Sequence, residues 1–233
     1  MEPKQPKALC IYCASPLYQL QDGNVKCSQC KKKYSPARIH QIKKTINAFC
    51  NDENALAASS SLALSYVTVL NYFQSFRHLV ARYSEEQYHL YRGENTQYEE
   101  YLYIEKSKRH NKSAIFDSHN FLTFGYDEQV YTLLMPSLNL FKQQFIDDNL
   151  EAIYHKEFSK FMRTSKIIKI SEHDNVIERF WHYFEQFITG FKGVSREHFP
   201  YYLKEAEFKF NTPKEMRSEI LEKLYFRPSV SDT

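Results

Sequence analysis

Two pairs of cysteines near the start of the chain constrain its fold more than any other feature. Cys10 and Cys13 form one C-x-x-C pair, and Cys27 and Cys30 form a second pair after 13 intervening residues. A tetrahedral Zn²⁺ ion takes four thiolates, and each short turn presents two of them about 3.7 Å apart. The ion also supplies folding energy to a segment that has little apolar core of its own. The pattern predicts a structural zinc ribbon over residues 1–38 with these four cysteines as the metal ligands.

Positive charge is concentrated in the same part of the chain. Residues 1–44 contain nine lysines and arginines but only two acids, so their net charge is +7, whereas the remainder has a net charge of −4. A polyanion is attracted to the basic end first. The sequence therefore predicts contacts with double-stranded DNA, and a solvated basic tail is the alternative. The basic side chains expected to bind DNA are Lys31, Lys32, Lys33, Arg38, Lys43 and Lys44.

The apolar segments of the chain are short. No run approaches the roughly 20 apolar residues that cross a bilayer, and the N-terminus lacks the apolar stretch of a signal peptide. We expect a cytoplasmic protein that contacts no membrane and keeps its five cysteines reduced or bound to metal. The fifth, Cys50, is expected to be a buried thiol.

Residues 39–92 have the pattern of a helix-turn-helix. Apolar residues recur every three or four positions from Ile39 to Cys50, which predicts a first amphipathic helix. Residues 51–54 offer an N-cap for a second, alanine-rich helix, and Ser65 caps a third helix that follows a short turn. In a helix-turn-helix this last helix enters the major groove of DNA.

The start of the third helix carries side chains that can hydrogen-bond base edges. Those expected to do so are Tyr66, Thr68 and Asn71. Further along, Arg77, His78 and Arg82 are candidates for phosphate contacts or for simple solvation. A three-helix bundle that binds no nucleic acid is the alternative.

Beyond residue 93 the period changes to that of strands. Three strands are expected over 98–104, 119–126 and 129–135, and the last two form a hairpin around Asp127 and Glu128. A helix over 136–146, a strand over 152–155, a short helix over 157–162 and a strand over 166–170 follow. Three helices finish the chain, and the last is expected to begin with Thr212 as N-cap and Pro213 as the first helical residue.

The predicted fold class is α+β with several domains. Residues 1–38 are expected to form the ribbon, residues 39–92 the helix-turn-helix, and residues 93–233 an RNase H-like α/β domain with C-terminal helices. That fold gathers acidic residues from its first strand, its fourth strand and its last helix around two metal ions.

The C-terminal part contains motifs typical of one family. Residues 173–181, HDNVIERFW, resemble the H-x-N-x-I-E-x-F-W signature of the zinc-ribbon, ISXO-type DDE transposases of bacterial insertion sequences. Residues 203–211, LKEAEFKFN, are similar to the family's L-K-E-x-E-F-R-F-N, and residues 130–132, 191–195 and 199–200 also match. The resemblance implies a nucleoid-associated bacterial protein that acts on double-stranded DNA, as a homodimer or with a partner protein.

The resemblance also maps a catalytic triad onto Glu100, Lys156 and Glu178. Two of these positions depart from the family pattern, because Glu100 stands where an aspartate is expected and Lys156 replaces the second aspartate. A lysine ammonium repels the divalent cations that such carboxylates hold. We therefore expect Lys156 to pair with Glu100 and Glu178 in place of the metals. An alignment error of one residue, which would bring His155 or Glu157 to this position, is the alternative.

Three functions are compatible with these features. The first is a DNA-binding protein derived from a transposase, with structural Zn²⁺ and a catalytically inactive nuclease site. The second is an active transposase that cuts and joins DNA ends with Mg²⁺. The third is a scaffold for protein interactions. A new metal site made by Glu178, His182 and Glu185 on one helical face is a further alternative, although such triplets are usually solvated or paired.

Overall fold

The computed structural model describes residues 8–93, 97–104, 116, 118–141, 175–191 and 194–227. The chain divides into two compact units: unit 1 comprises Met1–Tyr83 with Thr212–Thr233, and unit 2 comprises Ser84–Asn211. Unit 1 thus contains the last helix together with the N-terminal elements. The division into three domains, 1–38, 39–92 and 93–233, stays a prediction. None of the helices in the described part of the chain is both long and apolar enough to cross a lipid bilayer.

Unit 1 begins with a small antiparallel sheet. Its strands are β1 (Leu17–Gln19), β2 (Val25–Cys27) and β3 (Lys33–Tyr34), in the order β1-β2-β3. The β1–β2 hairpin turns at Gly23, whose φ of 77° a residue with a side chain rarely adopts. This sheet is too small to enclose a core, so the segment depends on what the cysteines hold.

The three predicted helices of the middle segment are confirmed. They are α1 (Pro36–Cys50), α2 (Ala55–Leu62) and α3 (Tyr66–Tyr91). The side chain of Asn54 accepts a hydrogen bond from the N–H of Ala57 at 2.9 Å, and the Ser65 hydroxyl accepts one from the N–H of Thr68 at 3.2 Å. Both side chains are N-caps, which satisfy helical N–H groups that have no partner in their own helix.

Aromatic packing holds the helices of unit 1 together. The ring of Phe49 in α1 makes edge contacts with Phe73 and Phe76 in α3, with ring centroids 5.2 and 5.5 Å apart. Cys50 is 2% exposed, which confirms the predicted buried thiol. Arg77 is also buried, and its guanidinium lies over the ring of Phe49. The prediction that Arg77 contacts phosphate or is solvated is therefore wrong, because its side chain is buried in the core of unit 1.

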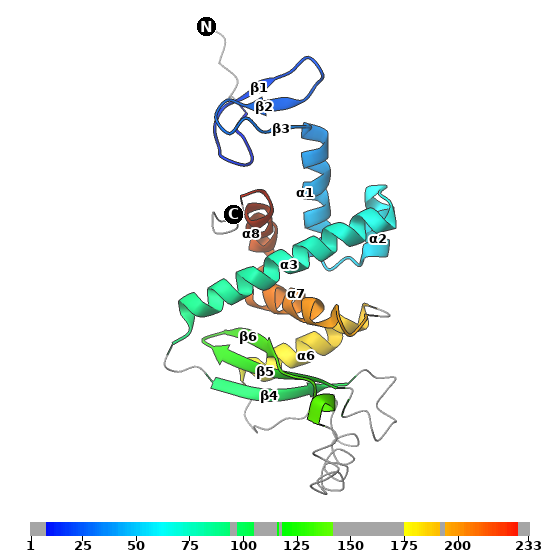
Figure 1. Ribbon diagram of the computed structural model, residues 1–233, viewed down its shortest axis with the longest axis vertical. Coiled ribbons are helices and arrows are strands. Elements are labelled where there is room, and N and C mark those ends of the chain that lie inside the picture. The colour runs from blue at the N-terminus through cyan, green and yellow to red at the C-terminus, as the bar shows by residue number, and fades with distance from the viewer. Residues whose placement is uncertain are drawn as a thin grey trace, which may run out of the picture. The chain divides into compact units, whose positions relative to one another are not determined.

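The last helix, α8 (Lys214–Phe226), lies beside α1 in unit 1 (Figure 1). Lys43 in α1 and Glu222 in α8 form an ion pair of 2.5 Å. The predicted start of this helix is wrong by one residue. Pro213 occupies the N-cap position without any side-chain cap, and the carbonyl of Thr212 accepts a hydrogen bond from Arg217 instead.

Unit 2 contains a second antiparallel sheet and two helices. The strands are β4 (Gln97–Tyr103), β5 (His119–Tyr126) and β6 (Gln129–Leu134), and the helices are α6 (Val176–Thr189) and α7 (Phe199–Asn211). The predicted β5–β6 hairpin is confirmed, and Asp127 at its turn has a φ of 51°. Only a short 3-10 helix, Leu138–Phe141, is described within the helix predicted over 136–146.

The α+β class is thus observed, whereas the RNase H-like fold stays a prediction. The strands expected over 152–155 and 166–170, and the helix between them, lie outside the described residues. Three antiparallel strands covered by helices are compatible with several α+β folds.

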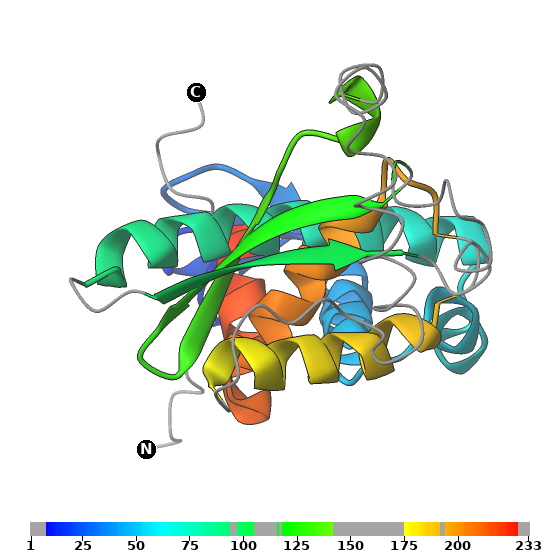
Figure 2. The ribbon, with the colours of Figure 1, turned by 90° about the horizontal axis from the view of Figure 1, so that it is seen from below.

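The core of unit 2 lies between one face of the sheet and α6 and α7. Trp181 in α6 stacks on Tyr101 in β4 with ring centroids 4.7 Å apart, and Phe199 in α7 stacks on Tyr103 at 4.8 Å. Figure 2 shows α6 and α7 side by side along the sheet. The C-terminal turns of α3 belong to unit 2, where Tyr88 stacks on Tyr131 of the opposite sheet face at 4.3 Å.

Gly125 sets the distance between β5 and α6. A Cβ atom on Gly125 would lie 2.9 Å from Cγ1 of Val176 and 3.0 Å from Cγ1 of Ile177. Both atoms sit on a packed helix, so we expect Gly125→Ala to lower the free energy of unfolding of unit 2 by about 1–3 kcal/mol. Denaturation followed by fluorescence of Trp181, the one tryptophan of the chain, measures this unit. Gly93→Ala is the control, because no atom lies within 4 Å of a Cβ placed there, and equal stability of the two variants would contradict the expectation.

Candidate metal centre and nucleic-acid-binding surface

The four cysteines of the ribbon form one cluster. The Sγ atoms of Cys10 and Cys30 are 3.7 Å apart, those of Cys13 and Cys27 are 3.4 Å apart, and all four lie within 4.8 Å of one another. Zinc–thiolate bonds of about 2.3 Å place sulfurs roughly 3.8 Å apart in a tetrahedron. The donor set and its spacing therefore fit Zn²⁺. Among the described residues, this is the one group of potential ligands close enough to hold a metal ion.

Each C-x-x-C turn is shaped by backbone conformation and by hydrogen bonds to sulfur. Ala14 and Lys31, which directly follow the second cysteine of each pair, both have φ of 59°. The backbone N–H groups of Gln29 and Cys30 donate to Sγ of Cys27 at 3.4 Å. Hydrogen bonds from the backbone and side chain of Ser15 lower the pKa of the Cys13 thiol to about 6. Such donors favour the thiolate, which is the form that binds metal.

An aromatic cluster supports the first cysteine turn. The ring of Tyr12 makes edge contacts with Tyr34 and Phe226, with centroids 5.4 and 6.0 Å apart. The Tyr34 hydroxyl accepts a hydrogen bond from the N–H of Ile11 at 3.2 Å, and Arg227 donates to the carbonyl of Ile11 at 2.9 Å. The end of α8 thus packs against the ribbon inside unit 1.

Most of the basic residues predicted to bind DNA are exposed. The exposed ones are Lys31, Lys32, Lys33, Arg38 and Lys44. Lys33 pairs with Asp22 at 2.6 Å, and the ammonium of Lys32 lies 4.2 Å from the centre of the Tyr12 ring. Lys43 differs from the others, because it is half-buried and paired with Glu222. We call these five exposed cations of the ribbon and α1 the basic surface; two of them, Lys32 and Lys33, contact neighbouring side chains.

The start of α3 differs in character from this basic surface. Tyr66 is 48% exposed, and Asn71 is also exposed. The hydroxyl of Thr68 is 2.7 Å from that of Ser65, so it takes part in capping the helix. Val67, which was not predicted to contact DNA, is 62% exposed. Its place two residues after the cap Ser65 indicates the outer side of the first turn.

In β4, Glu99 rather than Glu100 lies on the face covered by α6. Glu99 shares that face with Tyr101, because alternate residues of a strand face the same side. Its carboxylate accepts hydrogen bonds from the Tyr101 hydroxyl at 2.8 Å and from Nδ2 of Asn175 at 2.7 Å. Glu100 is exposed on the opposite face of the sheet. The structure therefore does not bring Glu100 and Glu178 to one face, and Lys156 lies outside the described residues.

A hydrogen bond from Asn175 links Glu99 to the start of α6. Asn175 is the N-cap of that helix, and its Oδ1 accepts a hydrogen bond from the N–H of Glu178 at 2.9 Å. Burial, reinforced by Glu99 and by the charge of Glu178, raises the pKa of Tyr101 well above its usual value. Tyr101 is therefore a hydrogen-bond donor to Glu99 at any physiological pH.

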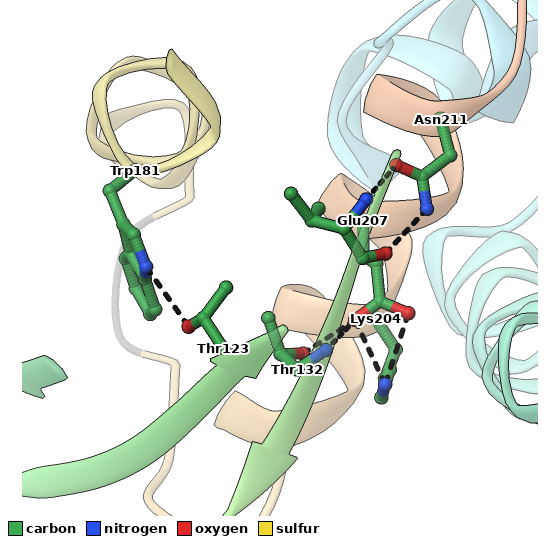
Figure 3. A network of polar contacts seen from close by, with 7 residues as sticks. Thr123, Thr132, Trp181, Lys204, Glu207 and Asn211 are labelled. Carbon is green, nitrogen blue, oxygen red and sulfur yellow. Dashed lines mark hydrogen bonds and ion pairs between the residues drawn. The ribbon is translucent and has the colours of Figure 1, made fainter. Parts of the chain in front are cut away.

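The motif over residues 203–211 anchors α7 to the edge of the sheet (Figure 3). The buried carboxylate of Glu207 accepts hydrogen bonds from the N–H of Thr132 at 2.8 Å and from its hydroxyl at 2.5 Å, and pairs with Lys204 at 2.8 Å. The side-chain amide of Asn211 bonds both the N–H and the carbonyl of Val130. An unpaired sheet edge would otherwise expose these backbone groups. The role of the motif in unit 2 is thus structural.

The chain is distantly similar to a transposase-like protein. It is 28% identical, over 110 residues, to an uncharacterized transposase-like protein of Haemophilus influenzae, an alignment that covers 40% of this chain and 88% of that protein. No protein-family model matches the chain. No solved structure matches it either.

Proposed function

We propose that this protein binds double-stranded DNA through unit 1, with Zn²⁺ held by the four cysteines, and that it does not cut DNA. The observation that carries the proposal is the exposed basic surface of the ribbon and α1, next to a cysteine cluster with the geometry of a zinc site. Lysine and arginine side chains on such a surface neutralise phosphates and release counterions from the duplex. The distant similarity to a transposase-like protein supports a nucleic-acid ligand over an acidic protein.

Two features support the absence of cleavage. The carboxylate of Glu99 is held by Tyr101 and Asn175, so both of its oxygens already accept hydrogen bonds. At the second position of the triad implied by the family resemblance, the sequence has Lys156. A pair of Mg²⁺ ions requires several carboxylates, and a nearby ammonium opposes their binding. In this proposal unit 2, which contains the motifs of the transposase family, is a scaffold and not a nuclease.

The salt dependence of DNA binding tests the proposal. We expect the affinity of the zinc-loaded protein for a 30-base-pair duplex to fall steeply with salt in fluorescence anisotropy titrations. The double variant Arg38→Ala, Lys44→Ala will reduce the slope of log K against log [salt] by about 1.8, because each lost phosphate contact accounts for about 0.9. The matched control is Lys214→Ala, Lys223→Ala, which removes two exposed cations from α8 of the same unit. Equal slopes for the two double variants would contradict this assignment of the surface.

A nicking assay separates the proposal from an active transposase. Supercoiled plasmid incubated with the protein and Mg²⁺ or Mn²⁺ is expected to remain intact. Cleavage products that disappear in the variant Glu178→Gln would overturn the proposed absence of cleavage, without affecting the proposal that unit 1 binds DNA.

A further inference from the structure

The segment of unit 1 predicted to be a helix-turn-helix presents one stripe of α3 to solvent. The buried side of α3 carries Val69, Phe73 and Phe76, which form the core with α1. On the other side, Val67 and Asn71 are exposed and lie one helical turn apart. α2 ends in a tight turn in which the N–H of Leu64 donates a hydrogen bond to the carbonyl of Ser59 at 3.1 Å, and α3 begins directly after this turn (Figure 1).

This surface has almost no charge. From Asn51 to Phe76 the sequence contains no lysine, arginine or histidine, and its acids are Asp52 and Glu53. It therefore offers little attraction to phosphates. In the same unit, the basic side chains of the ribbon and α1 supply the positive charge that attracts phosphates. Phosphate contacts position a protein on the duplex, whereas contacts with base edges select a sequence. A neutral helix in the same unit as these cations is suited to the second task.

The two exposed side chains match the chemistry of one base pair. An asparagine amide forms a bidentate pair with N6 and N7 of adenine, and an apolar side chain contacts the C5-methyl group of thymine. Thr68 is less suited to this role, because its hydroxyl is engaged with Ser65 at the helix cap. An isolated exposed valine is common on protein surfaces, but here it lies beside Asn71 on the outward stripe of a helix-turn-helix.

We propose that α3 reads an adenine–thymine pair in the major groove, with Asn71 on the adenine and Val67 on the thymine methyl group. The inference rests on the proposed binding of DNA by unit 1 and adds the base pair that it selects. Because both residues are exposed, their replacement leaves the core of unit 1 intact.

Selection from a random duplex library tests the inference. Zinc-loaded full-length protein is expected to enrich sequences with a fixed A·T pair, and Asn71→Ala will reduce the preference for that pair by about 5-fold or more. Replacing the thymine of the selected pair with deoxyuridine, which lacks the methyl group, will weaken binding by the wild-type protein but not by Val67→Ala. The matched control is Leu56→Ala, an exposed leucine of α2, which will retain the wild-type preference.

The outcomes separate the two proposals. Retention of the same A·T preference by Asn71→Ala, or equal sensitivity to deoxyuridine in Val67→Ala and wild type, overturns the inference while DNA binding stands. Enrichment of no A·T pair by a protein that binds the library also overturns it. Failure of the zinc-loaded protein to bind the library at any salt concentration refutes the proposed function itself.

Discussion

Replacing Cys27 with serine will abolish tight zinc binding and unfold the ribbon. Cys27 is fully buried, its sulfur accepts two backbone N–H groups, and it lies 3.4 Å from the sulfur of Cys13. Structural zinc sites contribute about 10–16 kcal/mol of binding free energy in small peptides, and the short strands of this ribbon offer little to replace it. A serine hydroxyl is a poor ligand for Zn²⁺, so most of that free energy is lost.

Metal content by native mass spectrometry and competition with a chelator measure this effect. The matched control is Cys50→Ala, which removes the cysteine that lies outside the cluster and will leave one zinc ion per chain. Fluorescence of Trp181 in unit 2 is expected to be the same in both variants. Full zinc occupancy in Cys27→Ser, with wild-type resistance to the chelator, would show that the four cysteines are not the ligands.

Replacing Glu207 with leucine will destabilise unit 2 by about 3–5 kcal/mol. The change leaves the N–H and hydroxyl of Thr132 without their acceptor and leaves the half-buried Lys204 without its counter-charge. Desolvation already lowers the pKa of Lys204, and Glu207 opposes that shift. Removing one partner of a buried pair is costly because the other charge stays desolvated.

Chemical denaturation followed by Trp181 fluorescence measures the loss of stability. Glu207→Gln keeps an acceptor for Thr132 and will lose less stability than Glu207→Leu. Glu219→Ala, which removes an exposed i,i+4 partner of Lys223 in unit 1, will leave the Trp181 transition unchanged. If Glu207→Leu loses less than about 1 kcal/mol, the network in Figure 3 does not anchor α7.

The features that were predicted correctly depend on local patterns. The cysteine spacing indicated the cluster, because two short turns with paired thiols suffice to define it. The hairpin at Asp127 and the caps Asn54 and Ser65 follow from residues that are close together in the sequence. None of these predictions required knowledge of which distant elements pack together.

The features that escaped prediction depend on contacts between distant residues. Each face of β4 carries one aromatic residue and one acid from the run Tyr98, Glu99, Glu100 and Tyr101, so the pattern does not say which face is buried. An error of one residue moves every side chain to the opposite face of the sheet. The packing of α6 decides that Glu99 faces inward. In α7, charged residues at 205, 207 and 209 suggest an exposed helix, yet all three are buried because each finds a charged or hydrogen-bonding partner.

Zinc dependence of DNA binding tests the central claim most directly. Anisotropy of a labelled 30-base-pair duplex is measured at low salt with the zinc-loaded protein, after removal of zinc by a chelator, and after zinc is restored. We expect binding by the loaded protein, loss of binding when the metal is removed, and recovery when it is returned. Unchanged affinity in protein shown to be free of zinc, or no binding by the loaded protein, would contradict it.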